Sequence, residues 1–260
     1  MKDNPAPDLK DFLDQKYHQF NTVAFIEEDP IRIPHQFDRK EDIEISGFLA
    51  SLIAWGKRSI IIRNAQRLVE MMDMVPFDFV MNASEDELIS LEEFIHRTFN
   101  GIDCIALIQS LRNVYQHHGG LEEIFSAGID PNDEDVFGGI IHARNILLSA
   151  PDFPDRTQKH IANPAKGSSA KRINMFLRWM VRPATAGVDF GIWKKIKPSQ
   201  LICPLDVHTG NVARKLELLS RKQNDWKAAV ELTQNLRVFD PEDPVKYDFS
   251  LFGLGVYDGF

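Results

Sequence analysis

Residues 160–181, HIANPAKGSSAKRINMFLRWMV, contain the strongest structural signal in the chain. Pro164 and Gly167 are residue types that interrupt helices and form turns, so they predict a hairpin. From residue 171 to residue 182 the apolar residues recur at intervals of three and four, which is typical of a helix with one buried face. The stretch therefore predicts a hairpin that leads directly into an amphipathic helix.

Residues 202–218, ICPLDVHTGNVARKLEL, predict a second helix with a well-defined start. Asp206 is a residue type preferred at helix N-caps, and Pro204 before it discourages an earlier start. We therefore expect a helix from Asp206 to about Leu219. Each of the two predicted helices begins beside a chemically reactive side chain, which is Asp206 here and Lys171 after the hairpin.

Helical periodicity extends over most of the remaining chain, and strand-like alternation is nearly absent. The sequence therefore predicts an all-α fold. A short helix is expected between Pro151 and the hairpin. Further helices are expected at residues 9–20, 46–72 (as two helices that meet near residues 55–57), 84–97, 103–117, 142–150 and 225–238.

Charge is unevenly distributed along the chain. The 260 residues carry a formal net charge of −8, which argues against a protein that coats nucleic acid through overall basicity. Residues 151–221, however, contain thirteen Lys or Arg against five Asp or Glu, a net charge of +8, while the remainder has 17 basic and 33 acidic groups, a net charge of −16. This basic segment either covers surface helices or meets an anionic partner, and the composition leaves both open.

Several classes of protein are excluded by what the sequence lacks. Two cysteines, Cys104 and Cys203, are too few for a CxxC zinc site, an iron–sulfur cluster or a disulfide framework, so we expect packed thiols. The absence of an apolar leader and of a membrane span predicts a cytoplasmic protein. The GxSxG, P-loop and HExxH motifs are also absent, and Gly253, Gly255 and Gly259 do not match a dinucleotide fingerprint.

The hairpin and the two helix starts together favour a site for a sugar–phosphate ligand. Backbone amides of a hairpin beside a helix N-terminus attract phosphate, and Gly167, Ser168 and Ser169 leave room for one. The same electropositive environment favours the neutral amine of Lys171, which can attack a sugar C1′ to form a Schiff base. An ionised Asp206 nearby would stabilise the positive charge that develops at C1′ as a base leaves.

These residues also carry a resemblance to a known family. Residues 160–181 and 202–218 resemble the hairpin-to-aspartate core of the helix-hairpin-helix DNA glycosylase superfamily, with LDVHTGNVAR as the most specific part. In that superfamily a VDTH-like turn carries the essential aspartate at a helix start, which corresponds to Asp206. Bifunctional members place their Schiff-base lysine just after the hairpin, which corresponds to Lys171. The spacing of 35 positions between the two is most similar to the archaeal 8-oxoguanine DNA glycosylase branch.

The resemblance extends over roughly residues 40–260 and looks closest to a bacterial family related to these glycosylases. It implies a single unit of two helical lobes with a helix-hairpin-helix motif and an interlobe cleft. One lobe is expected at residues 40–135, and the lobe of the hairpin and the aspartate at residues 136–225. Residues 1–39 and 226–260 are expected to pack across both lobes.

The function implied by the resemblance is base-excision repair. The protein would flip a damaged base, with 8-oxoguanine as the leading candidate, out of double-stranded DNA and break its N-glycosidic bond, with or without AP-lyase activity. The resemblance implies a monovalent cation bound at the hairpin and no organic cofactor. A cytoplasmic protein with this function would associate with the nucleoid when bound to DNA, and its protein partners stay open.

The DNA contacts implied by the resemblance lie on the hairpin and at the two helix starts. They are Lys166, Gly167, Ser168, Ser169, Arg172, Arg178 and His208.

Simpler interpretations of these residues stay open beside the functional ones. Asp206 is compatible with an ordinary N-cap, which stabilises a helix by roughly 0.5–2 kcal/mol. Lys171 shares the predicted polar helix face with Arg178 and Arg182, which is equally typical of a solvated lysine or of a phosphate contact. Trp193 lies among lysines, and we expect its indole to pack in the core rather than stack on a base.

Two other functions remain open on the sequence alone. One is a catalytically silent helix-hairpin-helix module that binds DNA or a protein through the basic segment. The other is a helical interaction protein unrelated to DNA, which would agree with the overall acidity.

Overall fold

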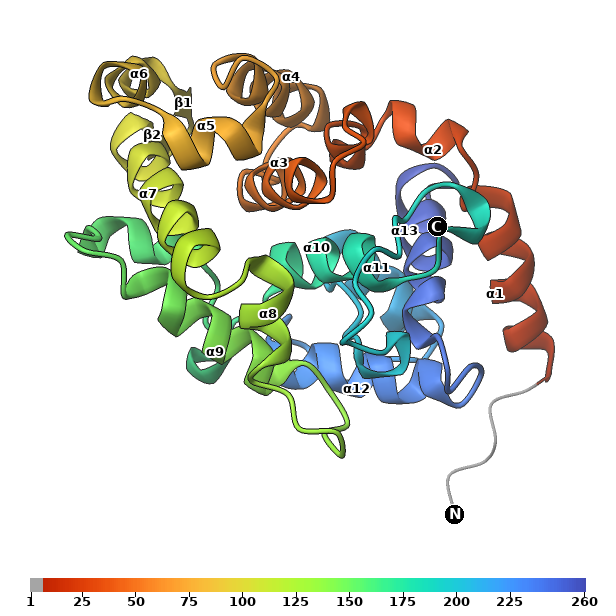
Figure 1. Ribbon diagram of the computed structural model, residues 1–260. Coiled ribbons are helices and arrows are strands. Elements are labelled where there is room, and N and C mark those ends of the chain that lie inside the picture. Colours follow the sequence, from red (N-terminus) through yellow and green to blue (C-terminus); the bar gives the residue numbers. More distant parts are fainter. Residues whose placement is uncertain (1–6) are drawn as a thin grey trace.

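The computed structural model describes residues 7–260 and is dominated by helices (Figure 1). The α-helices are Pro7–Phe20 (α1), Ala24–Glu27 (α2), Lys40–Leu52 (α3), Arg58–Glu70 (α4), Pro76–Asn82 (α5), Glu85–Ser90 (α6), Gly101–His117 (α7), Leu121–Ser126 (α8), Phe137–Leu148 (α9), Lys171–Val181 (α10), Val207–Lys215 (α11), Trp226–Arg237 (α12) and Asp248–Val256 (α13). The predicted all-α fold is confirmed.

Short 3-10 helices connect many of these elements. They are Pro30–Arg32 (η1), Pro34–Gln36 (η2), Leu91–Glu93 (η3), Asp155–His160 (η4), Pro164–Lys166 (η5), Ala184–Ala186 (η6), Pro198–Gln200 (η7) and Pro244–Tyr247 (η8). Across residues 7–260, no helix is both long and apolar enough to cross a membrane.

The turn between α3 and α4 confirms that residues 46–72 form two helices that meet near Trp55. Gly56 adopts a φ of 106°, a backbone conformation that L side chains rarely take, so the chain can reverse direction there without strain. The first of the two helices, α3, is buried over most of its length.

The prediction of one helix over residues 84–97 is wrong. The helix α6 ends at Ser90, and the chain continues into two short antiparallel strands, Ile95–His96 (β1) and Phe99–Asn100 (β2). The hairpin brings the buried rings of Phe94 and Phe99 together edge to face, with centroids 5.9 Å apart. Burial of both rings against each other therefore overrides the local helical pattern.

The helix α10 lies at the centre of the molecule and is buried on every side from Ile173 onward. Phe176 contacts Phe48 of α3 and the indole of Trp193, with ring centroids 5.4 Å and 5.3 Å apart. Trp193 is 1% exposed, which confirms its packed position. The predicted solvent-facing stripe of α10 beyond Lys171 is wrong, because other elements cover that face of the helix as well.

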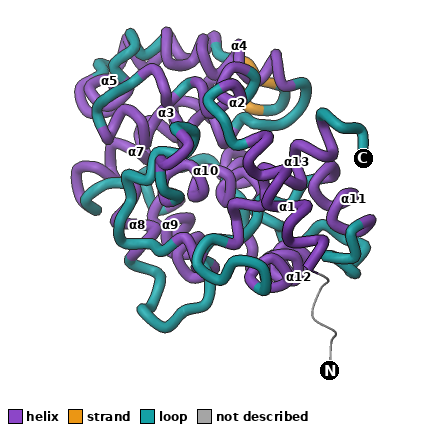
Figure 2. Tube along the Cα trace, turned by 90° about the vertical axis from the view of Figure 1, so that its right-hand side faces the viewer, coloured by secondary structure: helices purple, strands orange, loops and turns teal. Residues whose placement is uncertain are grey.

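The two ends of the described chain pack against each other. The helix α1 lies along α13, and α13 lies along α11, so the terminal segments close one side of the molecule (Figures 1 and 2). Their apolar residues join one continuous hydrophobic core that runs from Leu13 to Leu254. The boundaries predicted for two lobes stay a prediction, and residues 1–6 of the predicted N-terminal segment lie outside the described residues.

The chain turns at Pro164 and Gly167, as the sequence predicts, while the helix-hairpin-helix motif as a whole stays a prediction. The helix η5 begins at Pro164 and ends at Lys166, and Gly167 follows it with a φ of 88° that permits the reversal. The helix before the hairpin is the six-residue 3-10 helix η4 rather than an α-helix. Both cysteines of the chain are buried free thiols, as expected.

Candidate active site

A pocket of about 750 Å³ lies among segments that are far apart in the sequence. It is lined by α2 and η1, by the turn between α3 and α4, by the starts of α10 and α11, and by α13. Phe25, Trp55, Met175 and Phe252 give it an apolar wall. The volume falls in the usual range of pockets for small organic groups, about 300–1,000 Å³.

Lys171 and Asp206 meet in this pocket, as the sequence predicts. The Nζ of Lys171 lies 3.8 Å from Oδ2 of Asp206, and the two side chains keep 27% and 24% of their surface exposed. Each belongs to the start of a helix, Lys171 as the first residue of α10 and Asp206 as the N-cap of α11. The pair is therefore close enough to share charge and open enough to meet a ligand.

Asp206 is held in place by hydrogen bonds to its side chain and to its backbone carbonyl. Its Oδ1 accepts a hydrogen bond from the amide of Thr209 at 2.9 Å, the predicted N-cap contact. Its backbone carbonyl accepts a hydrogen bond from Nδ2 of Asn224, also at 2.9 Å. The hydroxyl of Ser169 donates to the carbonyl of Leu205 at 3.3 Å, which ties the hairpin to this turn. Only Oδ2 of Asp206 is left to face Lys171 and the pocket.

Arg172 supports the aromatic wall of the pocket and does not extend toward solvent. Its Nη1 donates to the carbonyl of Leu52 at the end of α3, and its guanidinium lies 4.8 Å from the ring centroid of Trp55. Burial lowers the pKa of Arg172 to about 10. On its other side Trp55 stacks on His160, with centroids 5.8 Å apart. Arg172, predicted as a DNA contact, therefore fixes the position of Trp55.

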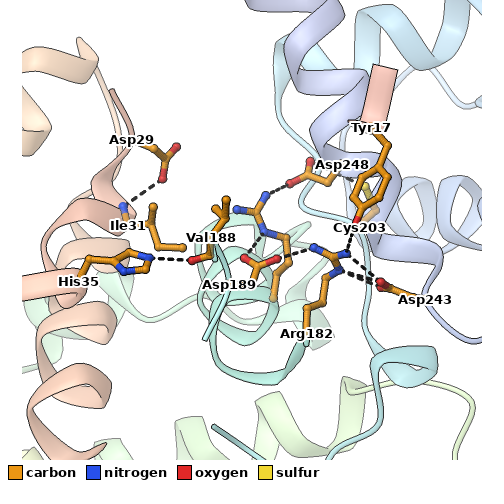
Figure 3. A network of polar contacts seen from close by, with 11 residues as sticks. Tyr17, Asp29, Ile31, His35, Arg182, Val188, Asp189, Cys203, Asp243 and Asp248 are labelled. Atoms are coloured by element: carbon orange, nitrogen blue, oxygen red, sulfur yellow. Dashed lines mark hydrogen bonds and ion pairs between the residues drawn. The ribbon is translucent and has the colours of Figure 1, made fainter. Parts of the chain in front are cut away.

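A network of buried arginine–aspartate pairs extends inward from the pocket lining, to which Arg178 and Asp248 belong (Figure 3). Arg178 pairs with Asp248 at 2.5 Å and with Asp189 at 3.3 Å. Arg182 pairs with Asp189 and, at 2.8 Å, with Asp243. The carboxylates raise the pKa of both arginines against the opposing effect of burial.

The prediction that Arg178 contacts DNA phosphates is wrong. The residue is 3% exposed, and both of its carboxylate partners are internal. A guanidinium on the buried face of a helix is retained only where carboxylates compensate its charge, and Asp189 and Asp248 do so here. Part of the charge of the basic segment is therefore compensated internally by carboxylates.

Asp248 makes the stability of the fold depend on pH. Burial raises the pKa of its carboxyl to about 6, although Arg178 opposes this effect. Because the folded-state pKa lies above the ordinary value, the proton stabilises the fold at low pH, and this contribution is lost as the pH rises to about 6.

We expect the difference in free energy of unfolding between the natural protein and Asp248→Asn to fall by roughly 1–3 kcal/mol from about pH 4 to pH 7. Urea unfolding at several pH values in this window measures the difference. A pH-independent difference would contradict the assignment of the raised pKa to Asp248.

The surface of the hairpin keeps some of the predicted DNA contacts exposed. Lys166, Gly167 and Ser168 are exposed, Ser169 is half-buried, and His208 is exposed at the first turn of α11.

The amides of the hairpin do not fit the predicted phosphate cradle. The amide of Gly167 donates to the carbonyl of Pro164 at 2.9 Å, and that of Ser168 donates to Asn163 at 3.3 Å. The amide of Ala170 donates to the hydroxyl of Ser168 at 3.2 Å. The tight 3-10 turn satisfies these donors internally, so the Lys166 side chain and the start of α10 are the groups left for a phosphate.

The hairpin offers a limited fit to the predicted monovalent cation. The carbonyl oxygens of Gly167 and Ser169 already accept hydrogen bonds, from the amide of Trp226 and from Nδ2 of Asn174. Two buried side-chain oxygens, Oδ1 of Asn163 and of Asn174, lack a partner within residues 7–260 and remain for a cation or a water. A cation there would add positive charge beside the hairpin, and no step proposed below depends on it. Nowhere in the same residues do three His, Cys, Asp or Glu side chains group to hold a metal.

Sequence reasoning missed several charged and aromatic residues of the pocket. Asp29 precedes Pro30, and an acidic N-cap before proline is a helix-start signal that could have marked it. Trp55 lies in the predicted turn, and nothing in the sequence indicates that its side chain faces a pocket. Asp248 and Phe252 come from the segment of residues 226–260, which was expected only to pack across the two lobes.

The fold and the site together define an all-α protein with a lysine–aspartate pair at two helix starts in one pocket. The chain belongs to the family described as protein of unknown function, DUF2400, whose model matches residues 29–257. No curated protein and no solved structure matches the chain. The family match takes in every pocket-lining residue except Phe25.

Proposed function

We propose that this protein is a DNA glycosylase that excises a damaged base from double-stranded DNA, with 8-oxoguanine as the leading candidate. The observation that carries the proposal is the 3.8 Å separation of Lys171 Nζ and Asp206 Oδ2 at a pocket of about 750 Å³. An amine and a carboxylate at that distance, beside a space of that size, can act on the same sugar carbon.

Chemistry on a base requires that the nucleotide leave the duplex stack, and the pocket suits a flipped nucleotide. Its aromatic side chains, among them Trp55 and Phe252, can stack on a base, since every base presents a π face. The Lys171 amine attacks C1′ while the N-glycosidic bond breaks. Asp206 stabilises the positive charge that develops on the sugar, and an imine between Lys171 and the sugar would permit AP-lyase strand cleavage as a second step.

The surface near the pocket mouth offers basic groups for the DNA backbone. Arg58 lines the pocket and also a neighbouring groove of about 900 Å³ that contains Arg32, Lys57 and Arg63. Three glutamates line the same groove, so its charge is mixed. These basic residues, together with the exposed Lys166 of the hairpin, support DNA as the partner.

Base release under single-turnover conditions tests the proposal. Duplexes that carry 8-oxoguanine, uracil or no lesion are incubated with the protein, and binding is measured in parallel at several salt concentrations. We expect release from one modified duplex and none from the undamaged one. Salt-sensitive binding without release would instead favour the silent binding module, and no binding even at low salt would favour an interaction protein unrelated to DNA.

A further inference from the structure

Asp29 lies in the pocket on the side of η1 and is buried and only partly hydrogen-bonded. It is 7% exposed and caps η1, with its Oδ1 accepting from the amide of Ile31 at 3.0 Å. Figure 3 shows the second carboxylate oxygen directed away from Ile31. Within residues 7–260, no hydrogen bond or ion pair engages this Oδ2. One acidic oxygen of the pocket is therefore available to a ligand.

The other two carboxylates that line the pocket are already engaged. Asp206 uses Oδ1 for the cap of α11 and presents Oδ2 to Lys171. Asp248 bonds Arg178 through Oδ2 and lies 4.0 Å from the Cys203 thiol through Oδ1. Among residues 7–260, Asp29 is thus the pocket carboxylate with an oxygen free of hydrogen bonds and ion pairs, and it approaches from a different segment of the chain.

The environment of Asp29 suits the exchange of a proton. Burial raises the pKa of its carboxyl, whereas the positive charges of Arg178, Lys171 and Arg58 act to lower it. The net direction is upward, so the protonated form is accessible, and the carboxylate that remains after proton transfer is stabilised by the guanidinium groups of Arg178 and Arg58. A group with both forms accessible is suited to general acid catalysis.

We propose that Asp29 is the general acid of this pocket and protonates the departing base. The inference rests on the proposed glycosylase function and assigns a catalytic residue that the lysine–aspartate pair does not supply. The role requires a base with a ring nitrogen or carbonyl oxygen that can accept the proton at the edge facing Asp29.

The step balances with the groups present in the pocket. The N-glycosidic bond breaks with its electron pair on the base, and the proton of the Asp29 carboxyl moves to the base, which leaves neutral. The neutral Lys171 amine forms the new bond to C1′, and one of its protons passes to the ring oxygen as the sugar opens. The products are an iminium at Lys171, an Asp29 carboxylate and the free base.

The substitution Asp29→Asn removes the acidic proton of this residue and keeps its role as a helix cap. Asparagine keeps a side-chain oxygen for the Ile31 amide and is as good an N-cap as aspartate, but it has no acidic proton. Asp225→Asn is the control, because Asp225 caps α12 through the amide of Ala228 and does not line the pocket, and its ion pair with Arg221 lies at the surface, where it contributes little to stability. Thermal unfolding of both variants verifies that the fold is kept.

Two rates measured with Asp29→Asn test the inference. We expect single-turnover base release to fall by about 10²- to 10⁴-fold, while borohydride trapping on a duplex with a preformed abasic site keeps its natural rate, because no base has to leave there. Base release within about threefold of the natural protein, or an equal loss in both assays, would overturn the role of Asp29. Absence of base release from the natural protein itself would overturn the proposed function, and this inference with it.

Discussion

Replacing Asp206 with asparagine is expected to slow base release by about 10²- to 10³-fold, the usual effect of removing one electrostatic contact from a transition state. The neutral amide cannot stabilise the positive charge that develops at C1′. Its side-chain oxygen can still accept from the Thr209 amide, so α11 keeps its N-cap. The effect should therefore appear in the rate of base release and not in the free energy of unfolding.

The control for this prediction is again Asp225→Asn, which makes the same chemical change at a cap outside the pocket. Single-turnover rates and urea unfolding are measured for both variants. If Asp206→Asn released base at the natural rate, Asp206 would be a helix cap alone. If it unfolded at much lower urea than the control, a structural role would account for any loss of activity.

Replacing Arg182 with methionine is expected to destabilise the fold by about 3–5 kcal/mol, the usual effect of removing one partner from a buried ion pair. Arg182 and Asp189 keep only 3% and 1% of their side-chain surface exposed. Without Arg182, Asp189 would retain only the 3.3 Å contact with Arg178, and Asp243 would lose its arginine partner. Methionine preserves much of the side-chain volume, so the loss reflects charge rather than a cavity.

Arg221→Met is the matched control, because Arg221 pairs with Asp225 on the surface of the protein. Exposed ion pairs contribute little to stability, and its urea midpoint should stay close to that of the natural protein. If Arg182→Met unfolded at the same urea concentration as this control, the buried network would not stabilise the fold as described.

The sequence predicted most helices and the placement of Lys171 and Asp206 at two helix starts, because both depend on local patterns. The start of α10 follows from Pro164 and Gly167, and the start of α11 from the N-cap preference of Asp206. Lys171 and Asp206 both stand at predicted helix starts. They could therefore be recognised as candidate site residues from the sequence, before the distance between them was known.

The features that the sequence did not predict depend on contacts between distant segments. Arg178 and Arg182 follow the spacing of a polar helix face, yet aspartates far along the chain turn that face inward. Asp29 enters the pocket from a segment more than a hundred positions before Lys171. Periodicity describes one helix at a time and carries no information about what covers its second face.

Borohydride trapping of Lys171→Gln beside Lys166→Gln tests the central claim, that Lys171 and Asp206 form a reactive pair acting on DNA. Lys166 is an exposed lysine of the same hairpin, so its replacement controls for loss of positive charge. On a duplex that carries the excised base or an abasic site, and at protein concentrations that saturate the DNA, we predict a covalent adduct with the natural protein and with Lys166→Gln, and none with Lys171→Gln. An adduct of natural yield with Lys171→Gln, or no adduct with the natural protein, would contradict the claim.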